Sequence, residues 1–278
     1  MQTLGIGHLI DTAWEQYRAQ FTPLLRVSSW FAVVALINLL AISFYPIDAA
    51  RLTRDLTALE ISAVALLILN ILFAVVVGIW CTNALIDLIH TQNASFKPLA
   101  KRAWSRFWPQ LQTQVLLWII YPLSVLIPFG VMMGGIHLGA IGFSPLLAIL
   151  IILLGLVLFA PAFVLTISLA FSSYHVVCED QRGLVALRES ARRVHAAFGA
   201  TLLRLVLPKI LYFGIFFLLQ FFIVTTTDVV LLAVFGDGTD ASARLRWMTL
   251  IVSYAGLFVL LNPLLLMTDY HIYKQLKA

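Results

Sequence analysis

Residues 145–171, PLLAILIILLGLVLFAPAFVLTISLAF, form an uninterrupted apolar stretch that contains no charged side chain. A helix rises about 1.5 Å per residue and the hydrocarbon core of a bilayer is about 30 Å thick, so about 20 apolar residues are needed to cross it. This stretch exceeds that length and is typical of a membrane-spanning helix.

Five further apolar runs of similar length surround it and predict six transmembrane helices in all. The first run is too long for the apolar region of a secretory signal peptide, so we interpret it as a span. The five runs are residues 24–44, 61–86, 115–132, 205–224 and 248–267.

The composition supports the same class of protein. Of the 278 residues, 62% are hydrophobic and only 11% are charged. A soluble domain is about half apolar and about a quarter charged, so this chain lacks the polar surface that a soluble fold needs. The net charge of +5 is not concentrated in a dense basic face. We therefore expect membrane lipids, and no nucleic acid, as partners.

The distribution of Lys and Arg predicts the orientation. With six spans, both termini share a side with the second-to-third and fourth-to-fifth connections. All but four of the 18 Lys and Arg residues fall on that side. The positive-inside rule therefore predicts that both termini are cytoplasmic. The exceptions on the other side are Arg51, Arg54, Arg244 and Arg246.

A short amphipathic segment precedes each odd-numbered span and suggests an internal repeat. The segments are residues 9–18, 99–107 and 186–194, and each is followed within a few positions by a helix breaker. The aligned positions are Ala13, Ala103 and Ser190, then Trp14, Trp104 and Ala191, then Tyr17, Phe107 and Val194, then Phe21, Leu111 and Phe198, and the breakers are Pro23, Pro109 and Gly199.

These patterns together predict an all-α polytopic membrane protein. Its six transmembrane helices would form three helical hairpins, each preceded by a short amphipathic interfacial helix. Residues 1–278 would form a single integral membrane domain with repeats at 5–90, 97–178 and 183–275.

The short segments are the candidate contacts for lipid headgroups or for a membrane protein partner. In the third segment an apolar stripe at helical spacing is expected, and Glu189 can pair with Arg193 at i,i+4. The alternative is that each segment is the cytoplasmic end of a long, tilted span. The stripe is Leu184, Leu187, Ala191, Val194 and Phe198. The candidate contacts are Trp14, Arg18, Lys101, Arg102, Trp104, Arg106, Arg188, Arg192 and Arg193.

Signatures of catalysis are weak. The segment from Asp237 to Arg244 matches the metal-binding signature of membrane CDP-alcohol phosphotransferases only in part, since Ser242 stands where that signature has arginine. We interpret the segment as a loop, and no zinc motif, nucleophile elbow or phosphate-binding loop occurs elsewhere. We therefore expect no enzyme activity, no metal and no cofactor.

Two alternatives to a non-catalytic protein stay open. A membrane enzyme or metal protein could use polar groups at the cytoplasmic ends of the even spans. A transporter or channel for an apolar or amphipathic solute could use polar groups inside the spans. The first set is Asp87, His90, His175, Asp269 and His271. The second set is Asn70, Asn83, Gln114 and Asn262, and other polar residues in the spans are Asn38, Lys209, Gln220 and Asp228.

Two stretches carry a resemblance to a known family. The N-terminal pattern IGHLIDTAWEQY at 6–17 and the stretch GLVALRESAR at 183–192 resemble YciC-like bacterial inner-membrane proteins and the membrane domain of some glycerophosphoryl diester phosphodiesterases. The resemblance covers nearly the whole chain. It implies a six-span bacterial inner-membrane protein, and the catalytic barrel of those phosphodiesterases is missing here. The function expected is that of a scaffold, an accessory subunit or a lipid-environment factor.

Overall fold

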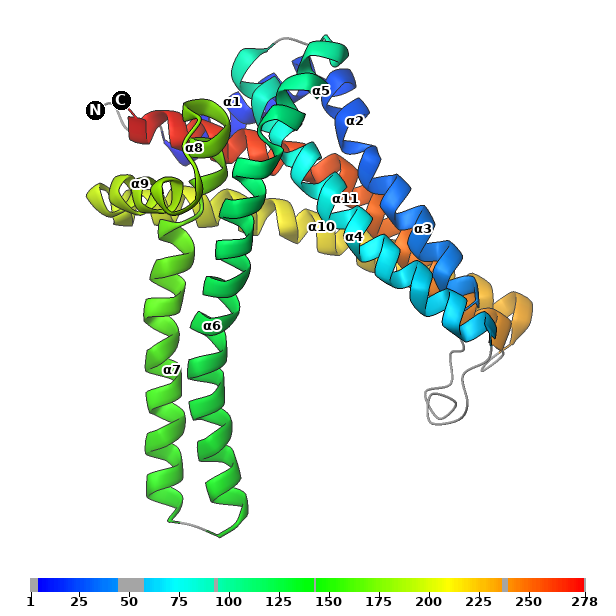
Figure 1. Ribbon diagram of the computed structural model, residues 1–278. Coiled ribbons are helices and arrows are strands. Elements are labelled where there is room, and N and C mark those ends of the chain that lie inside the picture. The colour runs from blue at the N-terminus through cyan, green and yellow to red at the C-terminus, as the bar shows by residue number, and fades with distance from the viewer. Residues whose placement is uncertain (1–4, 45–57, 93–94, 143, 237–239, 278) are drawn as a thin grey trace. The chain divides into compact units, whose positions relative to one another are not determined.

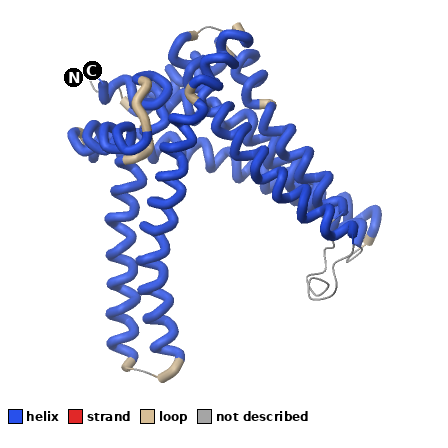
Figure 2. Tube along the Cα trace, viewed as in Figure 1, coloured by secondary structure: helices blue, strands red, loops and turns tan. Residues whose placement is uncertain are grey.

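The protein is an all-α polytopic membrane protein, as the sequence predicts. The computed structural model describes residues 5–44, 58–92, 95–142, 144–236 and 240–277, and every regular element in these ranges is a helix (Figures 1 and 2). The helices are α1 Ile6–Ala19, α2 Phe21–Ser28, α3 Trp30–Phe44, α4 Ala58–Thr91, α5 Phe96–Ser105, α6 Phe107–Ala140, α7 Pro145–Ser168, α8 Ser172–Glu179, α9 Gly183–Ala196, α10 Phe198–Phe235 and α11 Asp240–Lys277.

Six stretches of these helices are long and apolar enough to cross a membrane, which confirms the predicted number. Most are longer than their apolar runs. Helix α6, for example, has 34 residues, so it is about 50 Å long and extends beyond the hydrocarbon core of about 30 Å. The stretches are Phe21–Leu40, Val64–Thr91, Phe107–Ala140, Pro145–Glu179, Phe198–Phe235 and Ala241–Lys277.

The chain divides into two compact units. Unit 1 comprises Met1–Trp104 and Arg204–His271, and unit 2 comprises Ser105–Leu203 and Ile272–Ala278. This division does not follow the boundaries of the predicted repeats, and the single domain with three repeats stays a prediction.

Unit 1 is built around the N-terminal helices, α4 and the larger part of α11. Helices α3 and α4 pack side by side (Figure 1). The core contains Leu24, Leu88 and Met267, which are almost fully buried. Two hydroxyl groups join α1 and α2 to α11: Tyr17 Oη donates to the Leu260 carbonyl at 3.0 Å, and Ser28 Oγ donates to the Val259 carbonyl at 2.7 Å.

Unit 2 is built on the hairpin of α6 and α7, whose helices lie side by side along their length (Figure 1). Glycine allows the two backbones to approach. A methyl group at Gly155 would lie 2.9 Å from the backbone nitrogen of Met132, and one at Gly135 would lie 2.9 Å from the Ala148 carbonyl oxygen. Small residues permit such close packing in membranes, where apolar burial gives little driving force.

Proline explains where two of the short helices end. Pro23 and Pro109 are the third residues of α2 and α6. A proline has no N–H for the carbonyl four residues before it, and its ring collides with that carbonyl. Those carbonyls belong to Ala19 and Ser105, the last residues of α1 and α5. The third break lies at Ala197, two residues before Gly199. The short helices are therefore separate from the long ones and not their straight continuations.

The three short helices bury equivalent positions. In α1 the buried side chains are Leu9, Ala13 and Tyr17, at intervals of four. Around the two later short helices, the residues that the predicted alignment places opposite these three are buried as well. They are Leu99, Ala103 and Phe107 around α5, and Ala186, Ser190 and Val194 in α9.

The interpretation of 237–244 as a loop is wrong in part. Helix α11 begins at Asp240, so Ser242 and Arg244 are helical. Residues 237–239 lie outside the described residues, as do Arg51 and Arg54.

We predict that Gly155→Ala destabilises the hairpin of α6 and α7. The new methyl group would meet backbone atoms of Met132, which cannot rotate away, and overpacking of this kind costs about 1–3 kcal/mol. The control is Gly134→Ala, since a methyl group there meets nothing within 4 Å. Unfolding by denaturing detergent should show a lower free energy of unfolding for Gly155→Ala only. Equal stability of the two variants would contradict the close approach of the α6 and α7 backbones.

Candidate functional site

A turn between α8 and α9 brings charged side chains of unit 2 together. Helix α8 ends at Glu179, and Asp180 adopts a left-handed conformation with φ 53°, which ends the helix. Gly183 opens α9 with φ 49°, and its N–H donates to Thr113 Oγ1 of α6 at 3.1 Å. The turn therefore sets α9 back against α8 and α6.

Glu179 is the centre of this arrangement, which we call the Glu179 cluster: Glu179, His175, Arg193, Tyr273 and Lys277. Arg193 binds the carboxylate with both terminal nitrogens, at 2.9 and 3.0 Å. Tyr273 Oη donates at 2.8 Å, Lys277 Nζ lies 3.3 Å away, and His175 Nδ1 lies 3.1 Å away. The carboxylate thus joins α8 to α9 and to the end of α11 within unit 2.

Ser190 explains why α9 buries a polar residue where α1 and α5 bury alanine. Its hydroxyl accepts from the Phe171 N–H at 3.2 Å and donates to the Ser168 carbonyl at 2.8 Å. Both backbone groups belong to the break between α7 and α8. A buried backbone group without a partner is costly, so this hydroxyl stabilises the break.

The face of α9 that is buried within the protein covers only part of the predicted apolar stripe. Leu184 is 68% exposed, and the buried face runs instead through Ala186, Leu187, Ser190 and Val194. Arg193, a candidate headgroup contact, has a side chain only 18% exposed because it binds Glu179. The buried face of α9 is therefore shifted from the predicted stripe toward Ser190 and Arg193.

The predicted pair between Glu189 and Arg193 is confirmed at 2.9 Å, and Arg192 also binds Glu189 at 2.6 Å. Hydrogen bonds from Arg192, and then from Arg193, lower the pKa of Glu189 below its ordinary value. Glu189 is therefore ionised at neutral pH and offsets the positive charge of Arg192.

The Glu179 cluster holds its histidine away from solvent. Glu179 orients the ring of His175, as a carboxylate orients a general base. However, His175 is fully buried, and its Nε2 has no hydrogen-bond partner in the described part of the chain. A substrate cannot reach that nitrogen in this conformation, so the cluster serves to fix helices.

The predicted headgroup contacts fall into two sets. Arg102 binds the buried Asp87 at 2.7 Å, so this cation, like Arg193, holds helices, whereas Arg106 binds the exposed Asp180 at 3.2 Å. Among the described residues, the exposed cations without an ion pair include Arg18, Lys101 and Arg188. Exposed tryptophans accompany them: Trp14 is 47% and Trp104 53% exposed.

Each exposed tryptophan borders an apolar groove in unit 1. The Trp14 groove, of about 360 Å³, lies between α1, α2, α10 and α11. The Trp104 groove, of about 290 Å³, lies between α3, α4 and α5. In each groove, one long helix (α11 in the first, α4 in the second) contributes four lining residues, and the four are spaced identically along the two helices. The lining residues are Leu257, Leu260, Leu261 and Leu264 in the first, and Phe73, Val76, Val77 and Trp80 in the second.

The residues of the metal and enzyme alternative have separate partners. Asp87 binds Arg102, Asp269 binds Lys209 at 2.9 Å, and His90 Nδ1 lies 2.9 Å from Tyr270 Oη. Across the described ranges, no three His, Cys, Asp or Glu side chains are placed to hold a metal ion.

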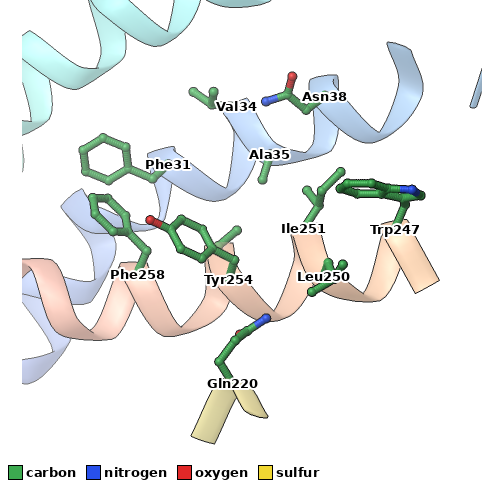
Figure 3. A pocket seen from close by; sticks show the side chains of 11 residues that line it. Phe31, Val34, Ala35, Asn38, Gln220, Trp247, Leu250, Ile251, Tyr254 and Phe258 are labelled. Carbon is green, nitrogen blue, oxygen red and sulfur yellow. The ribbon is translucent and has the colours of Figure 1, made fainter. Parts of the chain in front are cut away.

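Within the described ranges, three grooves of unit 1 are lined by none of the residues of the transporter alternative. Asn70 is 3% exposed, and Asn83 is fully buried with its amide donating to the Ala103 carbonyl at 3.3 Å. Two other polar residues of the spans, Asn38 and Gln220, line a larger groove in unit 1 along α11, which Figure 3 shows.

Sequence reasoning missed Glu179 and Tyr273, which join α8 to α9 and to the end of α11. A carboxylate at the end of an apolar run is a usable signal, because a charge there needs a partner. Its partners could not be read from the chain, because Tyr273 lies 94 residues away.

Comparison with known proteins gives no relative: no family model, no curated protein and no solved structure matches the chain.

We predict that Glu179→Gln lowers the free energy of unfolding by about 1–3 kcal/mol. The variant removes the charge that partners the largely buried Arg193, and breaking a buried pair costs more than breaking an exposed one. The control is the neighbouring Asp180→Asn, since Asp180 is 78% exposed and its pair with Arg106 is longer. Asparagine also tolerates the left-handed conformation. Titration with a denaturing detergent should show little change in the free energy of unfolding for the control. A similar decrease in both variants would refute the proposed role of Glu179 in stabilising the fold.

Proposed function

We propose that this is a non-catalytic protein of the bacterial inner membrane, with both termini cytoplasmic, that acts as a lipid-environment factor or as the scaffold or accessory subunit of a membrane complex. The observation that carries the proposal is that the short helices carry exposed cations and tryptophans: Trp14, Arg18, Lys101 and Trp104 in unit 1, and Arg188 in unit 2. We call these five residues, taken unit by unit, the headgroup layer.

The chemistry of the headgroup layer suits anionic phospholipids. Arg18, Lys101 and Arg188 are exposed and unpaired within the described residues. Each cation near an anionic membrane surface contributes about 1 kcal/mol. Tryptophan prefers the boundary between headgroups and hydrocarbon. The Trp14 and Trp104 grooves could then receive the adjoining acyl chains.

The bacterial inner membrane is inferred from the resemblance to YciC-like proteins and from the positive-inside rule. The excess of Lys and Arg on the side of the membrane that holds both termini supports a cytoplasmic position for the termini. The headgroup layer would then face the cytoplasmic leaflet.

A transporter or channel for an apolar or amphipathic solute is the second candidate. The groove along α11 favours it, because that groove combines an apolar wall with two polar side chains inside the spans.

We predict that the protein selects phosphatidylglycerol over phosphatidylcholine in the cytoplasmic leaflet. Inside-out membrane vesicles accept spin-labelled lipid into that leaflet, and the immobilised fraction measures selectivity. Each of Arg18→Gln, Lys101→Gln and Arg188→Gln should lower the preference by up to about fivefold, and high salt should do the same.

The matched control for the lipid experiment is Arg244→Gln. Arg244 is exposed and has no ion pair within the described residues, but the proposed topology places it on the opposite side. An effect of Arg244→Gln as large as that of Arg18→Gln, or no preference in the unaltered protein, would refute the proposal.

Alkaline phosphatase fusions test the proposed topology, since this enzyme folds only outside the cytoplasm. A fusion after residue 278 should be inactive, because the C-terminus is proposed to be cytoplasmic. A fusion at residue 142, in the connection between α6 and α7, should be active. The reverse pattern would place the headgroup layer on the wrong leaflet.

A further inference from the structure

A groove of about 530 Å³ runs along α11 between α3 and α10 in unit 1, and we call it the α11 groove. Figure 3 shows its wall of apolar and aromatic side chains, from Trp247 at one end to Phe31 and Phe258 at the other. Ligand sites are typically about 300–1,000 Å³ and mostly apolar with a few polar groups. The α11 groove has both properties.

The length of the groove matches one leaflet of a bilayer. Trp247 and Phe258 are eleven positions apart on one helix, so they are separated by about 16 Å along its axis. The hydrocarbon core is about 30 Å thick, and half of it is about the same length. Trp247 is 53% exposed and lies near the start of α11. A single hydrocarbon chain that enters beside Trp247 would fit the groove along its length.

Asn38 is the first polar group in this apolar wall. Its amide makes no hydrogen bond to any other described residue, although it can donate two and accept through its oxygen. An amide in hydrocarbon without a partner is costly. A group that both donates and accepts would satisfy it best.

Gln220 is the second polar group in the wall. Its Nε2 donates to Ser253 Oγ at 3.0 Å, and Ser253 Oγ in turn donates to the Thr249 carbonyl at 2.7 Å. In this arrangement Gln220 Oε1 is buried without a partner in the described chain. A small rotation of the side chain would present this oxygen to a donor in the groove.

We propose that the α11 groove binds a lipid alcohol: a membrane molecule with a hydrocarbon chain and a free hydroxyl group, such as a diacylglycerol or a long-chain alcohol. A hydroxyl group can accept from the Asn38 amide N–H and donate its one hydrogen to the amide oxygen of Asn38 or of Gln220. The esters of an ordinary phospholipid only accept. The site uses none of the residues of the headgroup layer, so either proposal can fail alone.

Photo-crosslinking of the full-length protein in lipid nanodiscs tests this site. The probe is a long-chain primary alcohol with a diazirine in its chain, and the comparison probe is its methyl ether, which cannot donate. Mass spectrometry of the labelled peptides locates the adduct. We expect label on α3 and α11 beside the groove, about tenfold more for the alcohol than for the ether. Unlabelled diacylglycerol should compete, and phosphatidylcholine should not.

Variants separate the contributions of the amides from that of the apolar wall. Asn38→Leu should reduce labelling by the alcohol to the level of the ether, whereas Asn262→Leu, which removes a span asparagine outside the groove, should not. Ala255→Phe should block both probes by filling the groove. Equal labelling by alcohol and ether in the unaltered protein would overturn the proposal, because the groove would then accept any hydrocarbon chain. Label that survives Ala255→Phe would also overturn it.

Discussion

Carboxylates at the ends of the apolar helices hold the short helices in place, and the rest of the described structure depends on these ion pairs. Asp87 at the end of α4 is 2% exposed and binds Arg102 of α5. Glu179 at the end of α8 binds Arg193 of α9. A charge removed from water needs an opposite charge close by, so each pair determines which face of a short helix is buried. The remaining face carries exposed cations and tryptophans.

This division of cations gives the basic residues two different roles. Arg102 and Arg193 bind largely buried carboxylates and stabilise the fold, whereas Arg106 pairs with the exposed Asp180. Arg18 and Lys101 have no ion pair in the described part of the chain and remain available to lipid. Composition cannot distinguish these roles, because both sets lie on the same kind of amphipathic segment. The distinction arises only when a carboxylate from another helix is close enough to form a pair.

The long helices present polar groups in two ways as well. Asn83 is fully buried and bonded to a backbone carbonyl, so it joins helices. Asn38 and Gln220 instead line the α11 groove, where one amide has no partner and the other has an unpartnered oxygen in the described chain. Amides that join helices and amides that await a ligand look the same in sequence. Their hydrogen-bond partners separate them.

The sequence by itself determined the membrane class, the six apolar spans and the ends of two short helices. Length, hydropathy and proline are local properties, and Pro23 and Pro109 act on carbonyls only four residues away. The pair between Glu189 and Arg193 is equally local. Tertiary structure alone decided which face of α9 is buried, because that face depends on Glu179 and on the backbone break that Ser190 bridges. It also decided which amides line a groove, because residues of α3, α10 and α11 must first come together.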